Sequence, residues 1–381
     1  MPQHIDLITV LDQVAPIIAQ NSTWLDATDG FIGENFDLLK EHGVFSALVP
    51  TEYGGGGATH TEMAEFIREL AHACPSTALT LSMHSHLVSA AVANDRAGRP
   101  GRALLEKVSS GQVILVSTGA NDWLASNGSA VKVEGGYQVT AFKPFASGSP
   151  KGDMMVTSVS YDDPIDGPLV LHFPLPMSTD GVSLLGDWQT LGMRATGSQT
   201  VKIDGAFVPE AAIALKRPRN GFHPAFSVIL TVAMPLIMSA YTGAAEKIAE
   251  MALERSHTKS ELNYVLAGEL INLLETARMA RKGMIDLCND FEFTPSEQLA
   301  SDVLVHKTVC ADHVTKVASK AMEVAGGLSF MRKNGIERFF RDLQGARFHP
   351  LPEKRQQLFT GRVALGLEPV ETAQPVLQAA E

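Results

Sequence analysis

The chain changes its hydrophobic period twice, and these changes constrain its fold more than any other feature. Residues 6–111 place apolar side chains at helical spacing, as in the stretch TEMAEFIRELAHA. Residues 112–219 instead hold short β-branched runs that alternate apolar and polar side chains, such as QVILVST and MMVTSVSY. Long helical patterns return after residue 220. The sequence therefore predicts three domains, at residues 1–111, 112–219 and 220–381.

This order of elements predicts an α+β multidomain protein. We expect an all-α N-terminal domain, a central β-barrel or β-sandwich, and a C-terminal antiparallel four-helix bundle. A Gly-Gly pair at 135–136 separates two alternating runs and indicates a hairpin. Thr294, Pro295 and Glu297 have the spacing of a helix start, with the threonine as the cap.

Composition and charge limit the partners. The formal net charge is -11 and the sequence pI is about 5.6, so the basic surface typical of a nucleic-acid-binding protein is not expected. The three cysteines lie far apart without metal-ligand spacing, which favours a reducing, cytoplasmic compartment and no metal site. The N-terminus lacks the pattern of a signal peptide, and the apolar run 226–240 is too short to span a bilayer. We therefore expect no membrane association, and a buried core helix at 226–240.

Four stretches give the chain a family resemblance. VPTEYGGGG, CPSTA, LGMRATGSQTVKIDGAFVP and AMEVAGGLSFMRKNGIERFFRDLQ occur in that order and together reach across almost the whole chain. They resemble the acyl-CoA dehydrogenase superfamily, which contains dehydrogenases and a related branch of flavin-dependent monooxygenases. The resemblance implies a flavoprotein oxidoreductase that binds FAD, or FMN if it is a monooxygenase. Consistently, no G-x-G-x-x-G motif follows a predicted strand.

The resemblance assigns three residues to the flavin ring. Thr118 falls on the loop that meets the flavin in this superfamily. Phe145 and Ser147 match an aromatic residue that covers the ring and a hydroxyl that faces its N5 atom. A redox ring requires an apolar face for stacking and a polar group at its reactive nitrogen.

Four further residues match positions near the distal half of the cofactor. Gly326 and Gly327 match glycines that let the backbone approach the pyrophosphate of a neighbouring subunit's FAD, and they also indicate a helix end. Arg255 matches an arginine after the first bundle helix. Glu323 stands where glutamine is usual, and a carboxylate there must turn away or pair with a cation. The resemblance implies a homodimer or homotetramer.

The catalytic base of the dehydrogenases is missing from its usual place. A glutamate in the turn after the Arg-Asp pair removes the α-proton of the thioester in that branch, and its position here falls on Pro350. Nor does the start of the first bundle helix, PAFSVILTV, contain a carboxylate. Two residues remain as candidate catalytic groups, His349 beside the expected position and Glu353 three residues beyond it.

Two reactions therefore remain open. The first is α,β-dehydrogenation of an acyl-CoA or acyl-carrier thioester, with an electron-acceptor flavoprotein as partner. The second is oxygenation of an aromatic or other small molecule, with a flavin reductase as partner and with histidines such as His84 or His86 near the ring. The VPTEYGGGG and CPSTA stretches favour dehydrogenation, while the missing carboxylates favour oxygenation. We place dehydrogenation first, and a flavin-free binding protein third.

Overall fold

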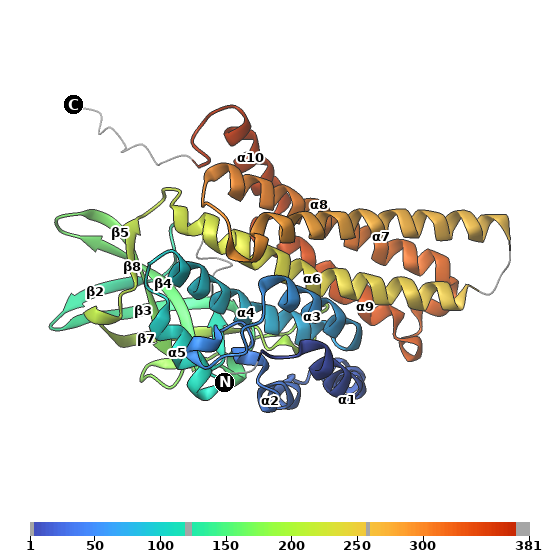
Figure 1. The fold of residues 1–381 in the computed structure, drawn as a ribbon, viewed down its shortest axis with the longest axis horizontal. Coiled ribbons are helices and arrows are strands. Elements are labelled where there is room, and N and C mark those ends of the chain that lie inside the picture. Colours follow the sequence, from blue (N-terminus) through green and yellow to red (C-terminus); the bar gives the residue numbers. More distant parts are fainter. Residues whose placement is uncertain (1–3, 119–123, 257–259, 371–381) are drawn as a thin grey trace.

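The computed structural model describes residues 4–118, 124–256 and 260–370, and its first block is helical (Figure 1). Asp6 caps the first helix through hydrogen bonds from the amides of Ile8 and Thr9. Thr59 and Glu62 form a reciprocal capping box at the third helix. The helices are α1 (Leu7–Thr28), α2 (Gly33–Glu41), α3 (His60–Ala73), α4 (Pro75–Arg96) and α5 (Arg102–Gly111).

The strands form one mixed sheet in the order β6-β7-β3-β2-β4-β5-β8, with β1 paired in parallel to β4. The predicted hairpin is present, since Val133 pairs with Gly136 where β2 and β3 meet. Side chains from β3, β4, β5 and β7 share one apolar core. The strands are β1 (Leu115–Ser117), β2 (Ser129–Val133), β3 (Gly136–Ala146), β4 (Met154–Asp163), β5 (Gly167–Pro176), β6 (Val182–Leu184), β7 (Gln199–Pro209) and β8 (Leu215–Pro218).

Three long helices, α6 (Pro224–Arg255), α7 (Glu261–Cys288) and α8 (Glu297–Ala325), pack side by side and carry the shorter α9 (Ile336–Leu343) and α10 (Glu353–Ala364) (Figure 1). Helix α8 begins later than predicted, because Ser296 rather than Thr294 is its cap and accepts a hydrogen bond from the amide of Leu299. Helix α6 is long and apolar enough to cross a membrane, but 89% of its most apolar window is buried inside the protein. It is the predicted core helix.

The hydrophobic residues form two cores. One core joins the N-terminal helices to the bundle and runs from Leu7 to Phe359, and the other lies within the sheet. The predicted fold class is confirmed, although the two helical blocks share one core. Secondary structure changes type near the predicted limits, after Gly111 and between Pro218 and Pro224. Whether the chain divides into three domains there stays a prediction.

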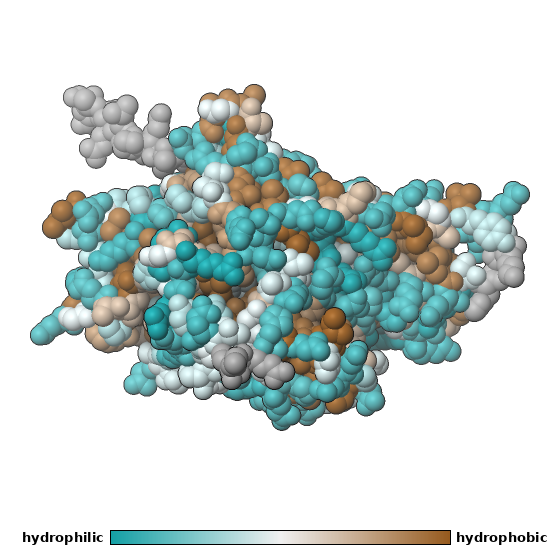
Figure 2. Space-filling model, viewed as in Figure 1, coloured by the Kyte–Doolittle hydropathy of each residue, from teal (hydrophilic) through white to brown (hydrophobic). Residues whose placement is uncertain are grey.

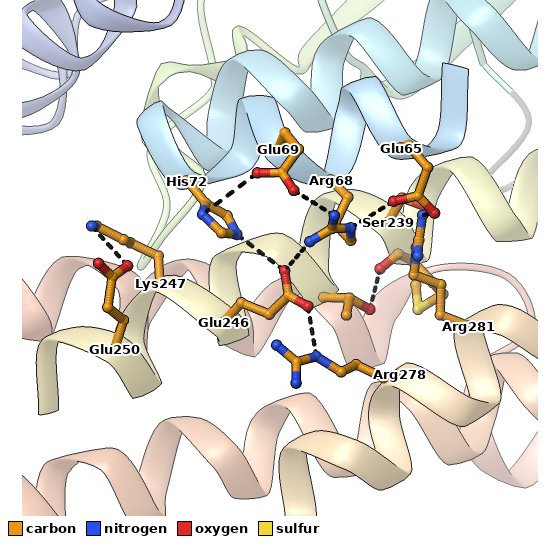
Figure 3. A network of polar contacts seen from close by, with 12 residues as sticks. Glu65, Arg68, Glu69, His72, Ser239, Glu246, Lys247, Glu250, Arg278 and Arg281 are labelled. Atoms are coloured by element: carbon orange, nitrogen blue, oxygen red, sulfur yellow. Dashed lines mark hydrogen bonds and ion pairs between the residues drawn. The ribbon is translucent and has the colours of Figure 1, made fainter. Parts of the chain in front are cut away.

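An ionic network around the buried Glu246 joins α3 to α6 and α7 (Figure 3). Glu246 on α6 accepts hydrogen bonds from Arg68 at 2.6 Å, His72 at 3.0 Å and Arg278 at 2.7 Å. Burial alone would raise the pKa of Glu246, but these hydrogen bonds and the positive charge of Arg68 lower it to about 2. The network therefore fixes the N-terminal helices against the bundle with a carboxylate that stays ionised.

Candidate active site

The end of strand β3 presents an exposed aromatic side chain. Phe145 has a φ of +62°, a conformation that is rare for a bulky residue, and its side chain is 53% exposed. The ring of Trp188 lies edge-on to it at 6.3 Å between centroids. Strained backbone of this kind gathers at functional sites. The two rings provide an apolar surface that suits a planar ligand.

A row of hydroxyl groups lies directly after this aromatic residue. Ser147 Oγ is 2.7 Å from Ser198 Oγ, and Ser198 Oγ is 2.7 Å from Thr196 Oγ1. Thr196 in turn donates to the carbonyl oxygen of Met193 at 2.9 Å. Ser198 and Thr196 are buried, whereas Ser147 is partly exposed. Ser147 is therefore the end of the row that a ligand can reach.

Thr118 follows strand β1 and is buried. Its hydroxyl donates to Thr157 Oγ1 on β4 at 2.9 Å. This contact ties the end of β1 to the neighbouring strand. The next residues, 119–123, lie outside the described part of the chain, so the assignment of Thr118 to the flavin stays a prediction.

His349 lies on the bundle side, in the segment between α9 and α10. Its Nε2 atom is 2.8 Å from the hydroxyl of Tyr241, a buried residue in the middle of α6. Lys307 on α8 donates to the carbonyl oxygens of His349 at 2.7 Å and Leu351 at 2.8 Å. A Cβ atom at Gly345 would stand 2.7 Å from the tyrosine hydroxyl, so this position needs glycine. Tyr241 on α6 thus holds the imidazole, and Lys307 on α8 holds the backbone beside it.

Burial sets the charge of this group. Burial, together with the charges of Lys307 and His86, lowers the pKa of His349 to about 3, so its ring is neutral at ordinary pH. Burial also raises the pKa of the Tyr241 hydroxyl well above its usual value. It lowers the pKa of Lys307 to about 8. The group at the site is therefore a neutral imidazole hydrogen-bonded to a protonated tyrosine.

The carboxylates nearby are engaged elsewhere. Glu353 is exposed at the start of α10, where its carboxylate pairs with Lys354 at 2.7 Å and accepts from Gln357 at 3.0 Å. The structure does not bring Glu353 to the imidazole, and its placement lends the predicted base role no support. Asp342 is buried and accepts a hydrogen bond from the amide of Met193. Burial raises the pKa of Asp342 to about 6.

The two histidines of α4 differ in their surroundings. His84 is fully occupied, because its Nε2 contacts the carbonyl of Phe45 at 2.7 Å and its Nδ1 accepts from the amide of Leu115 at 3.0 Å. His86 contacts the carbonyl of Ser82 through Nδ1 at 3.1 Å and lies close enough to His349 to lower its pKa. His84 therefore joins α4 to the sheet, and His86 belongs to the surroundings of His349.

The residues predicted to reach a neighbouring cofactor lie at the far end of α8. Gly326 is the C-cap of α8 with a φ of +66°, and a Cβ at either Gly326 or Gly327 would meet nothing within 4 Å. Arg255 donates to the backbone carbonyls of Met251 and Asn334. Glu323 pairs with Lys320 at 2.6 Å, which is one of the two arrangements that the sequence allows. The structure groups these residues at one end of the bundle. Their assignment to a neighbouring cofactor stays a prediction.

Comparison with known proteins identifies the family. Residues 9–100 match the family model of the acyl-CoA dehydrogenase N-terminal domain, and residues 220–349 match that of the C-terminal domain. The chain belongs to the acyl-CoA dehydrogenase family. It is thus an oxidoreductase of the acyl-CoA dehydrogenase type, as the resemblance implies.

Relatives of this family member include both branches. The chain is 27% identical to isobutylamine N-hydroxylase of Streptomyces viridifaciens, over 82% of this chain and 84% of that protein. It is 24% identical to the oxygenase component of p-hydroxyphenylacetate 3-hydroxylase of Acinetobacter baumannii, over 97% and 91%. Acyl-CoA dehydrogenases are also among the relatives. A solved structure of KijD3 in complex with FMN and an amino-sugar nucleotide superposes with a TM-score of 0.87 at 22% identity, over 96% of this chain and 94% of that one.

The sequence alone does not predict some residues of this acyl-CoA dehydrogenase-type site. Tyr241 is a polar aromatic residue inside an otherwise apolar helix, and that contrast was an available signal. Ser198 and Thr196 lie within the LGMRATGSQ stretch that supports the resemblance, but no spacing rule connects them to Ser147. Trp188 stands in an irregular segment without a periodic pattern. Contacts between elements bring these residues together.

Proposed function

We propose that the chain is the oxygenase component of a two-component flavin-dependent monooxygenase. The observation that carries this proposal is the state of His349, a neutral imidazole held by Tyr241 at 2.8 Å, while the carboxylates of Asp342 and Glu353 have other partners. This proposal reverses the order in which the sequence ranks the two reactions.

The site offers poor support for dehydrogenation of a thioester. That reaction needs a base to remove a weakly acidic α-proton, and efficient bases have a pKa near the working pH. Burial lowers the pKa of His349 to about 3, so the ring has little tendency to take up a proton. Glu353 is exposed and pairs with Lys354. Asp342, whose pKa burial raises to about 6, is held by the amide of Met193. Oxygenation does not require such a base.

The residues present fit a flavin between the sheet and the bundle. Phe145 and Trp188 offer an apolar surface for one face of the ring, and Ser147 offers a hydroxyl beside it. Reduced flavin, when bound, supplies two electrons to dioxygen, so that one oxygen atom enters the substrate and the other leaves as water. We propose FMN or FAD as the cofactor, since the acyl-CoA dehydrogenase resemblance implies FAD and KijD3 was solved with FMN.

The protein's own groups then hold and orient the reactants. Tyr241 is proposed to donate a hydrogen bond to Nε2 of His349, which would leave the proton of the imidazole on Nδ1. The Nδ1–H group of the neutral imidazole can donate a hydrogen bond to an oxygen atom of a reactant without giving up its proton. Lys307 fixes the backbone that follows the ring through the carbonyls of His349 and Leu351. The arrangement suits positioning rather than proton removal.

The partners follow from the proposed reaction. An oxygenase component needs reduced flavin from a separate reductase, and the relative from Acinetobacter baumannii is named as the oxygenase component of its hydroxylase. The substrate is proposed to be a small organic molecule, because the hydroxylases among the relatives act on such molecules.

We also propose a homo-oligomer. Hydrophobic residues reach the surface over the bundle helices in Figure 2, and Tyr264, Val265 and Ile271 on α7 are 62%, 58% and 46% exposed. Phe330, just after Gly326 and Gly327, is 83% exposed. These exposed apolar side chains suit a contact between copies of the chain near Gly326 and Gly327.

A coupled assay tests the proposed function. Purified protein is loaded with FMN or FAD, supplied with NADH and a general flavin reductase, and offered amines, phenols and aromatic sulfur compounds under ¹⁸O₂. We expect one ¹⁸O atom in a product of at least one substrate class. Protein that binds neither flavin at micromolar concentration, or that desaturates acyl thioesters instead, contradicts the proposal.

A further inference from the structure

The row of hydroxyls behind Ser147 has a fixed direction. Each hydroxyl group carries one proton and can therefore donate one hydrogen bond. Thr196 uses its proton on the carbonyl oxygen of Met193, which can only accept. The 2.7 Å contact between Thr196 and Ser198 then requires Ser198 to donate.

The same count continues to the exposed end. Because Ser198 has given its proton to Thr196, the 2.7 Å contact with Ser147 requires Ser147 to donate. Within residues 4–118, 124–256 and 260–370, Ser198 Oγ makes no hydrogen bond besides these two. The proton of Ser147 therefore points inward, and the outer side of its oxygen carries lone pairs.

The carbonyl that sets this direction is itself held firmly. The amide of Met193 donates to the buried carboxylate of Asp342. Its carbonyl oxygen accepts a second hydrogen bond from the indole Nε1 of Trp188 at 3.2 Å. Met193 has a φ of +53°, so these contacts maintain an uncommon backbone conformation. The carbonyl group of Met193 therefore has a fixed direction, whereas a hydroxyl group in its place could rotate.

We propose that Thr196 and Ser198 are positioning residues that make Ser147 a hydrogen-bond acceptor, and that the site thereby prefers the reduced flavin over the oxidised one. Reduced flavin carries a proton on N5 and donates there, whereas oxidised flavin has a lone pair on N5 and needs a donor. Ser147 matches the hydroxyl that faces N5 in the acyl-CoA dehydrogenase superfamily. A hydrogen-bond acceptor there stabilises the reduced flavin and repels the lone pair of the oxidised flavin. The inference rests on the proposed function, because an oxygenase component receives its flavin reduced.

The test measures binding rather than turnover. Dissociation constants for oxidised and for dithionite-reduced FMN and FAD are determined anaerobically by ultrafiltration. We expect the wild-type protein to bind the reduced form about tenfold more tightly, the usual effect of one well-placed hydrogen bond. This ratio corresponds to a midpoint potential about 30 mV above that of the free flavin.

Variants separate the direction of the row from its mere presence. Thr196→Val removes the link to Met193 and lets Ser198 turn its proton toward Ser147, so the preference should fall to about onefold or reverse. Thr196→Ser keeps the link and should retain the preference, and Ser198→Ala frees the proton of Ser147 and should abolish it. The direction of the row is wrong if folded Thr196→Val or Ser198→Ala protein keeps the wild-type ratio. Bleaching of the bound oxidised flavin by acyl thioesters would instead contradict the proposed function while leaving the ratio unchanged.

Discussion

The hydroxyl of Tyr241 lies 2.8 Å from Nε2 of His349, and it makes no other hydrogen bond to a described residue. We infer that its single proton is donated in a hydrogen bond to Nε2, which places the imidazole's own proton on Nδ1. The glycine at position 345 makes room for this contact, since a Cβ there would stand 2.7 Å from the hydroxyl. A buried tyrosine thus occupies Nε2 of the histidine and leaves Nδ1 as the other ring nitrogen.

The first prediction concerns the tautomer of His349. In protein labelled with ¹⁵N-histidine, the His349 signals should show a protonated Nδ1 and an unprotonated Nε2. Tyr241→Phe removes the donor at nearly constant volume, so both tautomers should become populated. Gly345→Ala should act in the same direction, because its methyl group displaces the hydroxyl. Gly361→Ala is the control, since a Cβ there meets nothing within 4 Å. A wild-type spectrum with the proton on Nε2 would contradict the assignment.

The second prediction separates His349 from Glu353. His349→Ala should lower product formation by about 10²-fold or more, the usual range for a positioned polar group at a reacting centre. Glu353→Gln should leave it unchanged, because the carboxylate is exposed and pairs with Lys354. The wild-type rate should show no step near pH 6.5, because burial lowers the pKa of His349 to about 3. Loss of activity in Glu353→Gln would restore that residue as a catalytic candidate.

The third prediction concerns acid stability. The pKa of Glu246 is lowered from 4.5 to about 2 in the folded protein, so its contribution to stability is full above pH 4.5 and disappears as the pH falls toward 2. Glu246→Gln should lower the free energy of unfolding at pH 7 by about 2 kcal/mol, since Arg68 keeps Glu65 and Glu69 as partners. It should also flatten the loss of stability below pH 4.5.

Urea denaturation at several pH values checks this. Glu250→Gln on the same helix is the matched control, because Glu250 forms an exposed pair with Lys247 and should matter little (Figure 3). Equal losses in the two variants would mean that the network adds nothing beyond ordinary surface pairing.

The fourth prediction concerns assembly. Because a Cβ at Gly327 meets nothing within 4 Å in the chain, Gly327→Val should fold normally. It should nevertheless retain flavin more weakly if a neighbouring subunit's cofactor approaches this backbone. Phe330→Asp should shift the assembly toward the monomer, since this side chain is 83% exposed. Sedimentation velocity and the flavin content of purified protein measure both effects. A flavin-loaded monomer of the wild-type protein would rule out the shared site.

The sequence predicts elements well wherever burial imposes a period. The helical block, the short strands, the hairpin at 135–136 and the buried α6 are all present. The start of α8 is displaced by two residues, because Thr294 and Ser296 are both good caps and the choice depends on contacts with α6, where Ser227 accepts from the amide of Ser296. The shared core of the two helical blocks has no signal in a local pattern.

The candidate site was only partly predictable for the same reason. His349, Phe145 and Ser147 stand out through their motifs. The groups that hydrogen-bond to His349 and Ser147 lie far from them in the sequence. Tyr241 is 108 positions from His349, and Ser198 is 51 positions from Ser147. The neutral state of His349 arises from burial and from Lys307, which no linear motif expresses. A tertiary contact, and not a linear motif, therefore carries the proposed choice between the two reactions that the sequence leaves open.

The most direct test of oxygenation against dehydrogenation is stopped-flow mixing of reduced-flavin-loaded protein with dioxygen. Dioxygen consumption and the return of oxidised-flavin absorbance are recorded together, with free reduced flavin as the reference. We expect that dioxygen is consumed first and that the absorbance of oxidised flavin returns after a lag, which His349→Ala shortens. Simultaneous consumption and return, at the same rate in wild-type and His349→Ala protein, would contradict it.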